Sequence, residues 1–276
     1  MLEGIKNRII QFYNPQKLIS LKMIGFFKEV EYNVYQNWVS EKAARFYSKP
    51  SSEIGSLIFW KQEFEKNEIG FFSSLINSKK FKILLGIGAY IWLHVTNWAE
   101  QCSGVEKIHA FEPAREKGSI LQQNLSLRAI GAKKEVVGIV VSDYNGKADF
   151  YDVSENTYSS LKDTQRKKTS EVYKVPVQTP DSFVIERKFP GIDFIKMDVE
   201  SFEHQVIKGE AEILKKWKPD LFVEIYKGLN SNTHLESTVA FLHAFWYKAY
   251  VMKIGLPGPF VSCDEKYYNY YFLVQE

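Results

Sequence analysis

The sequence has few cysteines, almost no net charge and no long hydrophobic run. Its two cysteines, Cys102 and Cys263, are too few for a disulfide framework or a cysteine-rich zinc site. The 36 Lys and Arg nearly balance the 33 Asp and Glu, and a formal charge of +3 argues against nucleic acid as a partner. The most apolar run, residues 83–95, falls short of the ~20 residues that span a bilayer. Because residues 1–16 also lack the apolar stretch of a signal peptide, we expect a cytoplasmic protein.

What is present is the composition of a globular protein with a substantial core. Hydrophobic residues make up 45% of the 276 residues and charged residues 25%, which is typical of folded domains. In residues 1–77, apolar side chains recur three and four positions apart, as in Ile19, Met23 and Phe26, and this spacing is typical of amphipathic helices. We therefore predict a helical N-terminal extension over residues 1–77 and a domain over residues 78–276.

The beginning of the extension is basic. Residues 1–28 contain five Lys or Arg and one acid, with Ile and Phe between them. One interpretation is a helix that contacts a membrane surface or a second copy of the chain. The other is a solvated helix face that packs on the domain. The sequence leaves both interpretations open.

The domain over residues 78–276 has the pattern of an α/β fold. Short apolar runs alternate with helical patterns, such as predicted helices over residues 91–100 and 202–217. This alternation is typical of right-handed crossovers, which build a mainly parallel sheet with helices on both faces. The fold class is therefore α/β and doubly wound. The runs that we predict as strands are residues 82–88, 107–112, 135–142, 192–198 and 219–225.

Two segments depart from this alternation. Residues 147–153 and 172–177 alternate in the manner of strands around a polar loop, which predicts an inserted or edge hairpin near the site. Residues 247–254 and 267–274 flank a connection rich in Gly and Pro at residues 255–259. We expect them to close the domain as a C-terminal antiparallel hairpin.

The functional site of an open parallel sheet lies outside the carboxyl ends of its strands. At the first end, small residues would let backbone amides approach a ligand closely. Four of the five predicted ends carry an acid, which is costly at a buried position unless the acid is paired. We therefore look for the site among the end residues, which in strand order are Gly86, Gly88 and Ala89; Glu112; Ser142 and Asp143; Asp198 and Glu200; and Glu224.

The Gly-x-Gly turn of Gly86 and Gly88 suggests a nucleotide cofactor. The dinucleotide fingerprint needs a third glycine where this chain has Ile91. Glu112 stands where an acid binds the ribose hydroxyls of an adenosine cofactor, although an acid at this position also caps the next helix. A nicotinamide or nucleotide-sugar enzyme is therefore a minor alternative.

The acids at the fourth strand end suit proton transfer. Asp198 and Glu200 are two positions apart on an extended strand end and point to the same side. If a helix starts near Glu200, Glu203 and His204 return to the same face. Such a cluster can raise the pKa of one member to that of a useful base, although Glu203 also fits an ordinary helix-start acid and His204 a surface residue. No ligand spacing demands a metal held with Glu224, and we predict none.

The motifs at these strand ends resemble the FkbM family of S-adenosylmethionine-dependent methyltransferases over residues 84–225. The most specific part is residues 192–203, whose text is similar to the family block I-K-x-D-V-E-G-x-E, with Ser201 in place of glycine. The resemblance implies a class I methyltransferase-like Rossmann fold and S-adenosylmethionine as cofactor. Supporting matches lie at Phe111-Glu112-Pro113, Val141-Ser142-Asp143 and residues 219–224.

The first loop departs from the family pattern. Where the family has D-x-G-A-N-x-G, residues 86–92 read Gly-Ile-Gly-Ala-Tyr-Ile-Trp. The resemblance implies that the acid and the glycine-lined turn hold the amino-acid end of the cofactor. Gly86 cannot accept a hydrogen bond from an ammonium group, and Tyr90 and Trp92 add large rings. Because one charged hydrogen bond contributes about 1.5–3 kcal/mol, we expect this loop to weaken cofactor binding.

The resemblance implies an enzyme, and the altered loop implies an alternative. The enzyme would be an S-adenosylmethionine-dependent O-methyltransferase that acts on a hydroxyl of a sugar, glycan, lipid or secondary metabolite. The alternative is a catalytically inactive methyltransferase-like binding or scaffolding module in which Tyr90 and Trp92 fill the cofactor pocket. An open polar pocket beside Glu112 would favour the enzyme. In that enzyme the cofactor would be bound by Gly86, Gly88, Ala89, Glu112, Ser142 and Asp143, and the hydroxyl would meet Asp198, Glu200 and Glu224.

Overall fold

The computed structural model describes the α/β domain and the helix before it. The chain divides at residue 62 into two units, and all described residues belong to the second. The helices predicted in residues 1–65, and most of the helix predicted over residues 91–100, lie outside the description. The predicted boundary at residue 77 falls within helix α5 (Lys66–Lys79), which packs on the domain. The described residues are 66–90, 98, 101–126, 131–153, 161, 169, 171–199, 201–225, 235–253, 256–261 and 267–274.

Eight strands form the main sheet, in the order β10-β9-β11-β8-β7-β1-β2-β3. All five residues of β1 are buried, as expected for a central parallel strand covered on both faces. Strands β2 and β7 flank β1, so the carboxyl ends of these three strands lie next to one another. The mutually parallel strands are β1 (Ile83–Ile87), β2 (Lys107–Phe111), β3 (Lys133–Val137), β7 (Phe194–Met197) and β8 (Asp220–Glu224).

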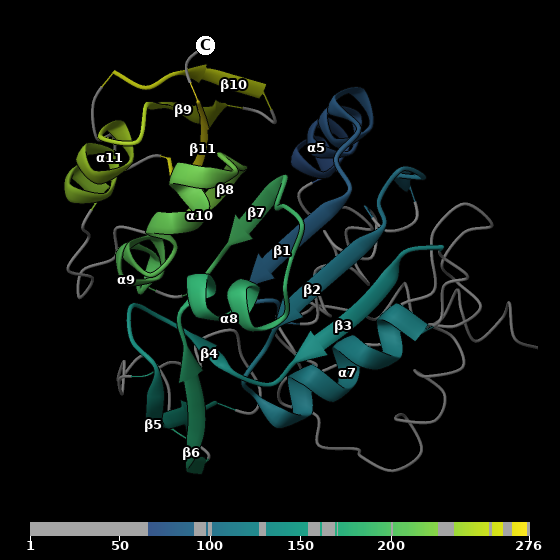
Figure 1. Cartoon of the computed structure of the whole chain (residues 1–276), viewed down its shortest axis with the longest axis vertical. Coiled ribbons are helices and arrows are strands. Elements are labelled where there is room, and N and C mark those ends of the chain that lie inside the picture. Colours follow the sequence, from purple (N-terminus) through teal and green to yellow (C-terminus); the bar gives the residue numbers. More distant parts are fainter. Residues whose placement is uncertain are drawn as a thin grey trace, which may run out of the picture. The chain divides into compact units, whose positions relative to one another are not determined.

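Helices cover both faces of this sheet (Figure 1). On one face, Phe72 of α5 and Leu121 of α7 pack against Leu84 and Phe222 of the sheet. On the other face lie α8, α9, α10 and α11. This arrangement confirms the predicted α/β, doubly wound fold. None of these helices is long and apolar enough to cross a membrane. Their bounds are α7 (Arg115–Ser126), α8 (Pro180–Glu186), α9 (Glu203–Lys208), α10 (Ala211–Lys216) and α11 (Leu235–His243).

A second, three-stranded sheet contains β4 (Val140–Val141), β5 (Gly146–Asp152) and β6 (Glu171–Gln178), in the order β4-β6-β5. Strands β5 and β6 are antiparallel, which confirms the predicted inserted hairpin. The prediction of one strand over residues 135–142 is wrong. Ile139 N–H donates to Val137 O (3.0 Å), and this tight turn ends β3 and sends β4 into the second sheet.

The single helix predicted over residues 202–217 is also wrong, because the segment forms two helices, α9 and α10. At the break, a Cβ on Gly209 would lie 2.3 Å from the carbonyl oxygen of Ser142, so the backbone is pressed against another segment. Asp181 of α8 accepts two backbone N–H bonds in the first turn of α10, each 2.9 Å long. These tertiary contacts start a new helix where the sequence pattern alone would continue the old one.

The C-terminal segment closes the main sheet with antiparallel strands. Strand β9 (Tyr247–Lys253) pairs on one side with β10 (Leu256–Pro259) and on the other with β11 (Asn269–Val274), which also pairs with β8. The predicted C-terminal antiparallel hairpin is confirmed. The segment predicted as its connection, residues 255–259, contributes the edge strand β10, and an edge is where prolines are tolerated in a sheet.

Candidate functional site

The carboxyl ends of β1, β2 and β7 form one continuous edge. Ala89 N–H donates to the carbonyl oxygen of Phe111, the last residue of β2 (2.9 Å). Asp198 N–H donates to the carbonyl oxygen of Ile87, the last residue of β1 (3.0 Å). Glu112 N–H donates to the last residue of β3 (3.1 Å). Parallel pairing thus extends beyond the ends of the strands and fixes Ala89, Glu112 and Asp198 side by side.

Gly88 forms the turn after β1. Its φ is +75°, and a Cβ there would lie 1.7 Å from the carbonyl oxygen of Asp198. Only glycine permits this close approach of the two strand ends. Gly86, in contrast, lies inside β1, opposite Ala110 of β2 and Lys196 of β7.

The Glu112 carboxylate is buried and held by two loops. The residue is 6% exposed. Its Oε1 accepts the N–H of Ala114 (2.9 Å), and its Oε2 accepts the N–H of Tyr90 (2.6 Å). Burial raises the pKa of Glu112, and the positive charge of Lys117 opposes this shift. Each carboxylate oxygen has a second lone pair that can accept a hydroxyl hydrogen.

Three more side chains join Glu112 in what we call the Glu112 cluster, which comprises Glu112, Lys117, Asp152 and Tyr173. Lys117 Nζ lies 3.8 Å from Asp152 Oδ1, and the Tyr173 hydroxyl donates to Asp152 Oδ2 (3.0 Å). Burial raises the pKa of Tyr173, so its hydroxyl keeps its proton and stays a donor. The cluster ties the second sheet to the edge of the main sheet.

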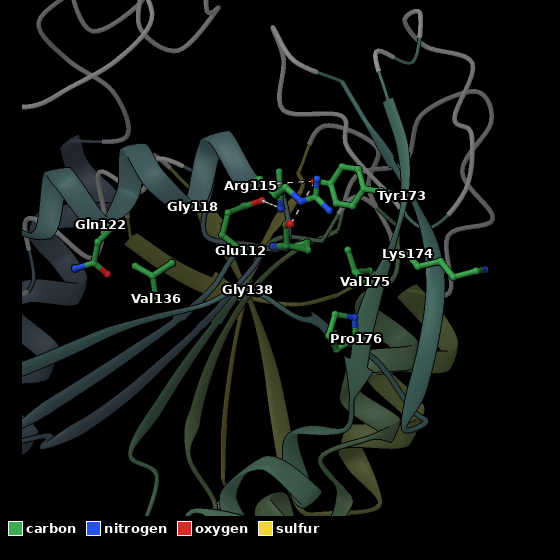
Figure 2. Close-up of a pocket in the computed structure, with 12 residues that line it drawn as sticks. Glu112, Arg115, Gly118, Gln122, Val136, Gly138, Tyr173, Lys174, Val175 and Pro176 are labelled. Carbon is green, nitrogen blue, oxygen red and sulfur yellow. Dashed lines mark hydrogen bonds between the residues drawn. The ribbon is translucent and has the colours of Figure 1, made fainter.

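A pocket of about 410 Å³ adjoins Glu112 between α7 and β6 (Figure 2). Gly118 and Gln122 of α7 and Val136 of β3 line one side. Tyr173 lines the other, with the guanidinium of Arg115 4.3 Å from the centre of its ring. The further lining residues are Pro113, Ala114, Gly138, Lys174, Val175 and Pro176. The pocket is open, and its lining is both polar and apolar.

A second group of charges lies at the end of β7. We call it the Asp198 cluster, which comprises Lys196, Asp198 and Glu203. Lys196 Nζ lies 3.5 Å from Asp198 Oδ2, and the exposed fractions of the two side chains are 4% and 36%. The aspartate is therefore accessible while its counter-ion is buried. Such a carboxylate can accept a proton from a bound hydroxyl.

Glu203 stabilises the turn after β7. It is 5% exposed, and its Oε1 accepts the N–H groups of Val199 (3.3 Å) and Ser201 (3.1 Å). Burial raises its pKa to about 7, and the nearby charge of Asp198 adds to the shift. Ser201, where the family has glycine, has a φ of +78°. His204 is half-buried beside α11, and its Nδ1 lies 3.1 Å from Thr238 Oγ1.

The other predicted site residues lie in different surroundings. Ser142 and Asp143 follow β4 in the second sheet, where the Ser142 hydroxyl donates to Asp143 Oδ1 (3.3 Å). Asp143 Oδ2 lies 3.7 Å from Lys208 Nζ of α9. Glu224 ends β8, and the pairing of Met197 with Val223 makes it the neighbour of Asp198 on the adjacent strand. Glu200 lies outside the described residues.

The sequence did not indicate Lys117, Asp152 or Tyr173, because they come from α7, β5 and β6 and form no motif along the chain. The buried acid Glu112 was the available signal, since it required a partner. Within the described ranges, no three His, Cys, Asp or Glu side chains are grouped so as to hold a metal ion.

Comparison with known proteins gives one family. The model of the methyltransferase FkbM domain matches residues 86–248. No curated protein matches the chain significantly.

Several solved structures are similar at low identity. The methyltransferase FkbM of Methylobacillus flagellatus KT is 18% identical with a TM-score of 0.49, and the match covers 70% of this chain but 44% of that one. An O-methyltransferase from Bacillus cereus in complex with SAH is 12% identical with a TM-score of 0.47, covering 87% and 96%. The O-methyltransferase TomG from Streptomyces achromogenes is 9% identical with a TM-score of 0.47, covering 88% and 96%.

Proposed function

The chain belongs to the FkbM methyltransferase family, and from this premise we propose that it is an S-adenosylmethionine-dependent O-methyltransferase. The acceptor would be a hydroxyl of a sugar, glycan, lipid or secondary metabolite. The cofactor would lie across the carboxyl ends of β1 and β2, where an adenosine-binding sheet holds its ligand.

The observation that carries this proposal is the geometry of Glu112. Its carboxylate is directed by one N–H bond to each oxygen, from Ala114 (2.9 Å) and Tyr90 (2.6 Å), and an open pocket lies beside it. A carboxylate with one lone pair left on each oxygen fits the two neighbouring hydroxyls of a ribose. The residues present at the end of β2 therefore fit the cofactor.

The end of β1 and the loop that follows it fit the cofactor less well. Gly86 offers no side-chain acceptor for the amino-acid end of the cofactor, and the centre of the Tyr90 ring lies 5.5 Å from Lys117 Nζ. This loop supports the second candidate, the inactive binding module. The described lining of the pocket beside Glu112 does not include Tyr90, which favours the enzyme.

The Asp198 cluster provides for proton transfer. S-adenosylmethionine, when bound, supplies a methyl group on a positively charged sulfur. A hydroxyl that accepted this methyl group would have to give up its proton. Asp198 is a third exposed and would accept this proton on a carboxylate oxygen, and the buried Lys196, whose Nζ lies 3.5 Å from Oδ2, would hold the carboxylate in position.

Calorimetric titration with S-adenosylhomocysteine tests the cofactor site. We expect the full chain to bind and Glu112→Gln to bind about 100-fold more weakly or worse, because two charged hydrogen bonds are lost at about 1.5–3 kcal/mol each. Glu106→Gln is the matched control, since Glu106 directly precedes the same strand at its opposite end and pairs with Lys82. Chains that bind are then incubated with S-adenosylmethionine and hydroxylated acceptors, and methyl gain is measured by mass spectrometry.

The outcomes separate the two candidates. Full-chain protein that is folded yet does not bind at millimolar ligand would overturn the enzyme and leave the binding module. Equal affinity of the full chain and Glu112→Gln would show that the cofactor does not use this carboxylate.

A further inference from the structure

Asn269, the first residue of β11, carries a buried amide whose oxygen has no partner. The residue is 7% exposed, and no donor among the residues that the structure describes reaches its Oδ1. Burial takes this oxygen away from water without replacing the lost hydrogen bonds, which is costly and rare in native proteins. A hydrophobic side chain of similar size would avoid the cost. A ligand that donates a hydrogen bond to this oxygen would explain why the amide is there.

Asn269 lies directly opposite Glu224. The two residues are register partners in the antiparallel pairing of β11 with β8. Beside them, Ile225 N–H donates to the carbonyl oxygen of Tyr268 (2.7 Å), which is the pattern of a non-hydrogen-bonded pair. In such a pair the two side chains lie on the same face of the sheet and approach each other most closely. The amide of Asn269 is therefore directed to the face that carries the Glu224 carboxylate.

Asp198 lies on the same face. The register of β7 and β8 makes it the neighbour of Glu224. Its Oδ2 lies 3.5 Å from Nζ of Lys196, two positions earlier on β7, and this Nζ lies 5.9 Å from the ring centre of Phe222, two positions before Glu224. Residues two positions apart share a face of a strand. Asp198, Glu224 and Asn269 thus form a row across three adjacent strand ends, which we call the polar row.

The polar row is accessible at one end and buried at the other. The Asp198 side chain is 36% exposed, Glu224 is half-buried and Asn269 is 7% exposed. Because neighbouring strands lie about 4.8 Å apart, the row extends over about 10 Å. Two carboxylates and an amide oxygen accept hydrogen bonds, and the two negative charges disfavour an anionic group. The row therefore suits a ligand that presents several hydroxyls.

We propose that Asn269 is a specificity-determining residue of the acceptor site. Its amide oxygen and the Glu224 carboxylate accept hydrogen bonds from a polyhydroxylated acceptor, such as a sugar, whose reacting hydroxyl lies at Asp198. The inference rests on the proposed function, because it takes Asp198 as the group that receives the proton. An acceptor with a single hydroxyl leaves the buried amide unpaired, and a site built to bind a hydroxyl discriminates against an analogue that lacks it.

The first test compares myo-inositol with cyclohexanol, which share a six-membered carbon ring and differ in the number of hydroxyls. The full chain is incubated with S-adenosylmethionine and each probe, and methyl ether formation is measured by mass spectrometry. We expect kcat/KM to be at least about tenfold higher for myo-inositol. Asn269→Leu removes the amide at similar volume and should abolish this preference, while its kcat/KM for cyclohexanol stays within about twofold. Asn269→Ala supplies the comparison if Asn269→Leu does not fold.

The second test is urea unfolding of the free protein, which requires no cofactor or acceptor. An amide that is kept for a ligand is a burden in the free chain, so Asn269→Leu should lower the equilibrium constant for unfolding about threefold or more. An amide that served the fold would give the opposite sign. Ser73→Ala is the matched control, because it removes another buried oxygen without a partner, in α5, and should keep the preference for myo-inositol.

The outcomes distinguish this inference from the proposed function. If the chain binds S-adenosylhomocysteine but methylates cyclohexanol as readily as myo-inositol, or methylates neither probe, the inference is overturned and the cofactor site stands. If Asn269→Leu keeps the preference, or does not lower the equilibrium constant for unfolding, the inference is also overturned. If the unmodified chain does not bind S-adenosylhomocysteine at all, the inference and the proposed function both fall.

Discussion

The Glu112 cluster and the Asp198 cluster flank β1 and each combine a buried lysine with carboxylates, but they are built differently. The Glu112 cluster takes its members from the end of β2 and from α7, β5 and β6, across residues 112–173. The Asp198 cluster comes from residues 196–203, one strand end and the turn after it. The first therefore depends on tertiary packing of two sheets, and the second mainly on local backbone geometry.

The two clusters also differ in how far their carboxylates are exposed to solvent. Glu112 is 6% exposed, whereas the Asp198 side chain is 36% exposed. A buried, fully directed carboxylate suits binding of a fixed ligand, because its hydrogen bonds are formed away from water. An accessible carboxylate suits exchange of a proton with a substrate that enters and leaves. From this comparison we propose that binding lies on one side of β1 and chemistry on the other.

The largest expected effect comes from the residue that joins the two sides. Gly88→Ala would place a Cβ 1.7 Å from Asp198 O at a φ of +75°. We expect a loss of about 3–5 kcal/mol in the free energy of unfolding, from left-handed strain and from a backbone clash that cannot relax. Urea unfolding measures it.

The control for Gly88→Ala is Gly104→Ala, where a Cβ would meet open space. Its free energy of unfolding should change by less than about 0.5 kcal/mol. Equal losses in the two variants would contradict the close approach of the ends of β1 and β7.

Gly88 also shows what could be predicted from the sequence. The turn after β1, the parallel strands and Glu112 at the end of β2 were predicted, because buried apolar runs that end in Gly or an acid are local signals. The break between α9 and α10 was not predicted, since it depends on the contact of Gly209 with Ser142 and on the cap from Asp181. Contacts between distant segments leave no periodic pattern.

A pH-dependent effect is expected within the Asp198 cluster. Burial raises the pKa of Glu203 to about 7 from an ordinary value near 4.5. The folded protein therefore binds this proton more tightly than the unfolded chain, and the resulting stability is complete below pH 4.5 and is lost as the pH rises to 7. Relative to Glu203→Gln, which does not titrate, the unmodified chain should lose up to about 3 kcal/mol across this window.

Urea unfolding of the two chains at pH 4.5, 6 and 7.5 measures this difference. Other carboxyls are common to both chains and cancel. Glu106→Gln is the control, because the ion pair with Lys82 lowers the pKa of Glu106, which is the direction opposite to that of Glu203. A flat difference for Glu203→Gln would mean that folding does not change the pKa of Glu203.

The two clusters also differ in how far the sequence indicated them. The spacing of Asp198, Glu200 and Glu203 indicated a cluster of carboxylates at the end of β7, because strand and helix periodicity bring such neighbours together. The Glu112 cluster gave one signal, the acid itself. Its partners Lys117 and Asp152 are 35 positions apart, and only the packing of the second sheet on α7 brings them within 3.8 Å.

The smallest expected effect tests that packing directly. Tyr173→Phe removes the hydroxyl that donates to Asp152 and accepts the N–H of Arg115. We expect a loss of about 1–2 kcal/mol in the free energy of unfolding, with a fall in S-adenosylhomocysteine affinity of less than about tenfold, because Lys117 stays in place. Tyr151→Phe, on the adjacent strand, is the matched control, since its hydroxyl makes no hydrogen bond within the described part of the chain. If Tyr173→Phe left both quantities unchanged, the second sheet would not help to hold Glu112, and the contrast between a tertiary cluster and a local one would fail.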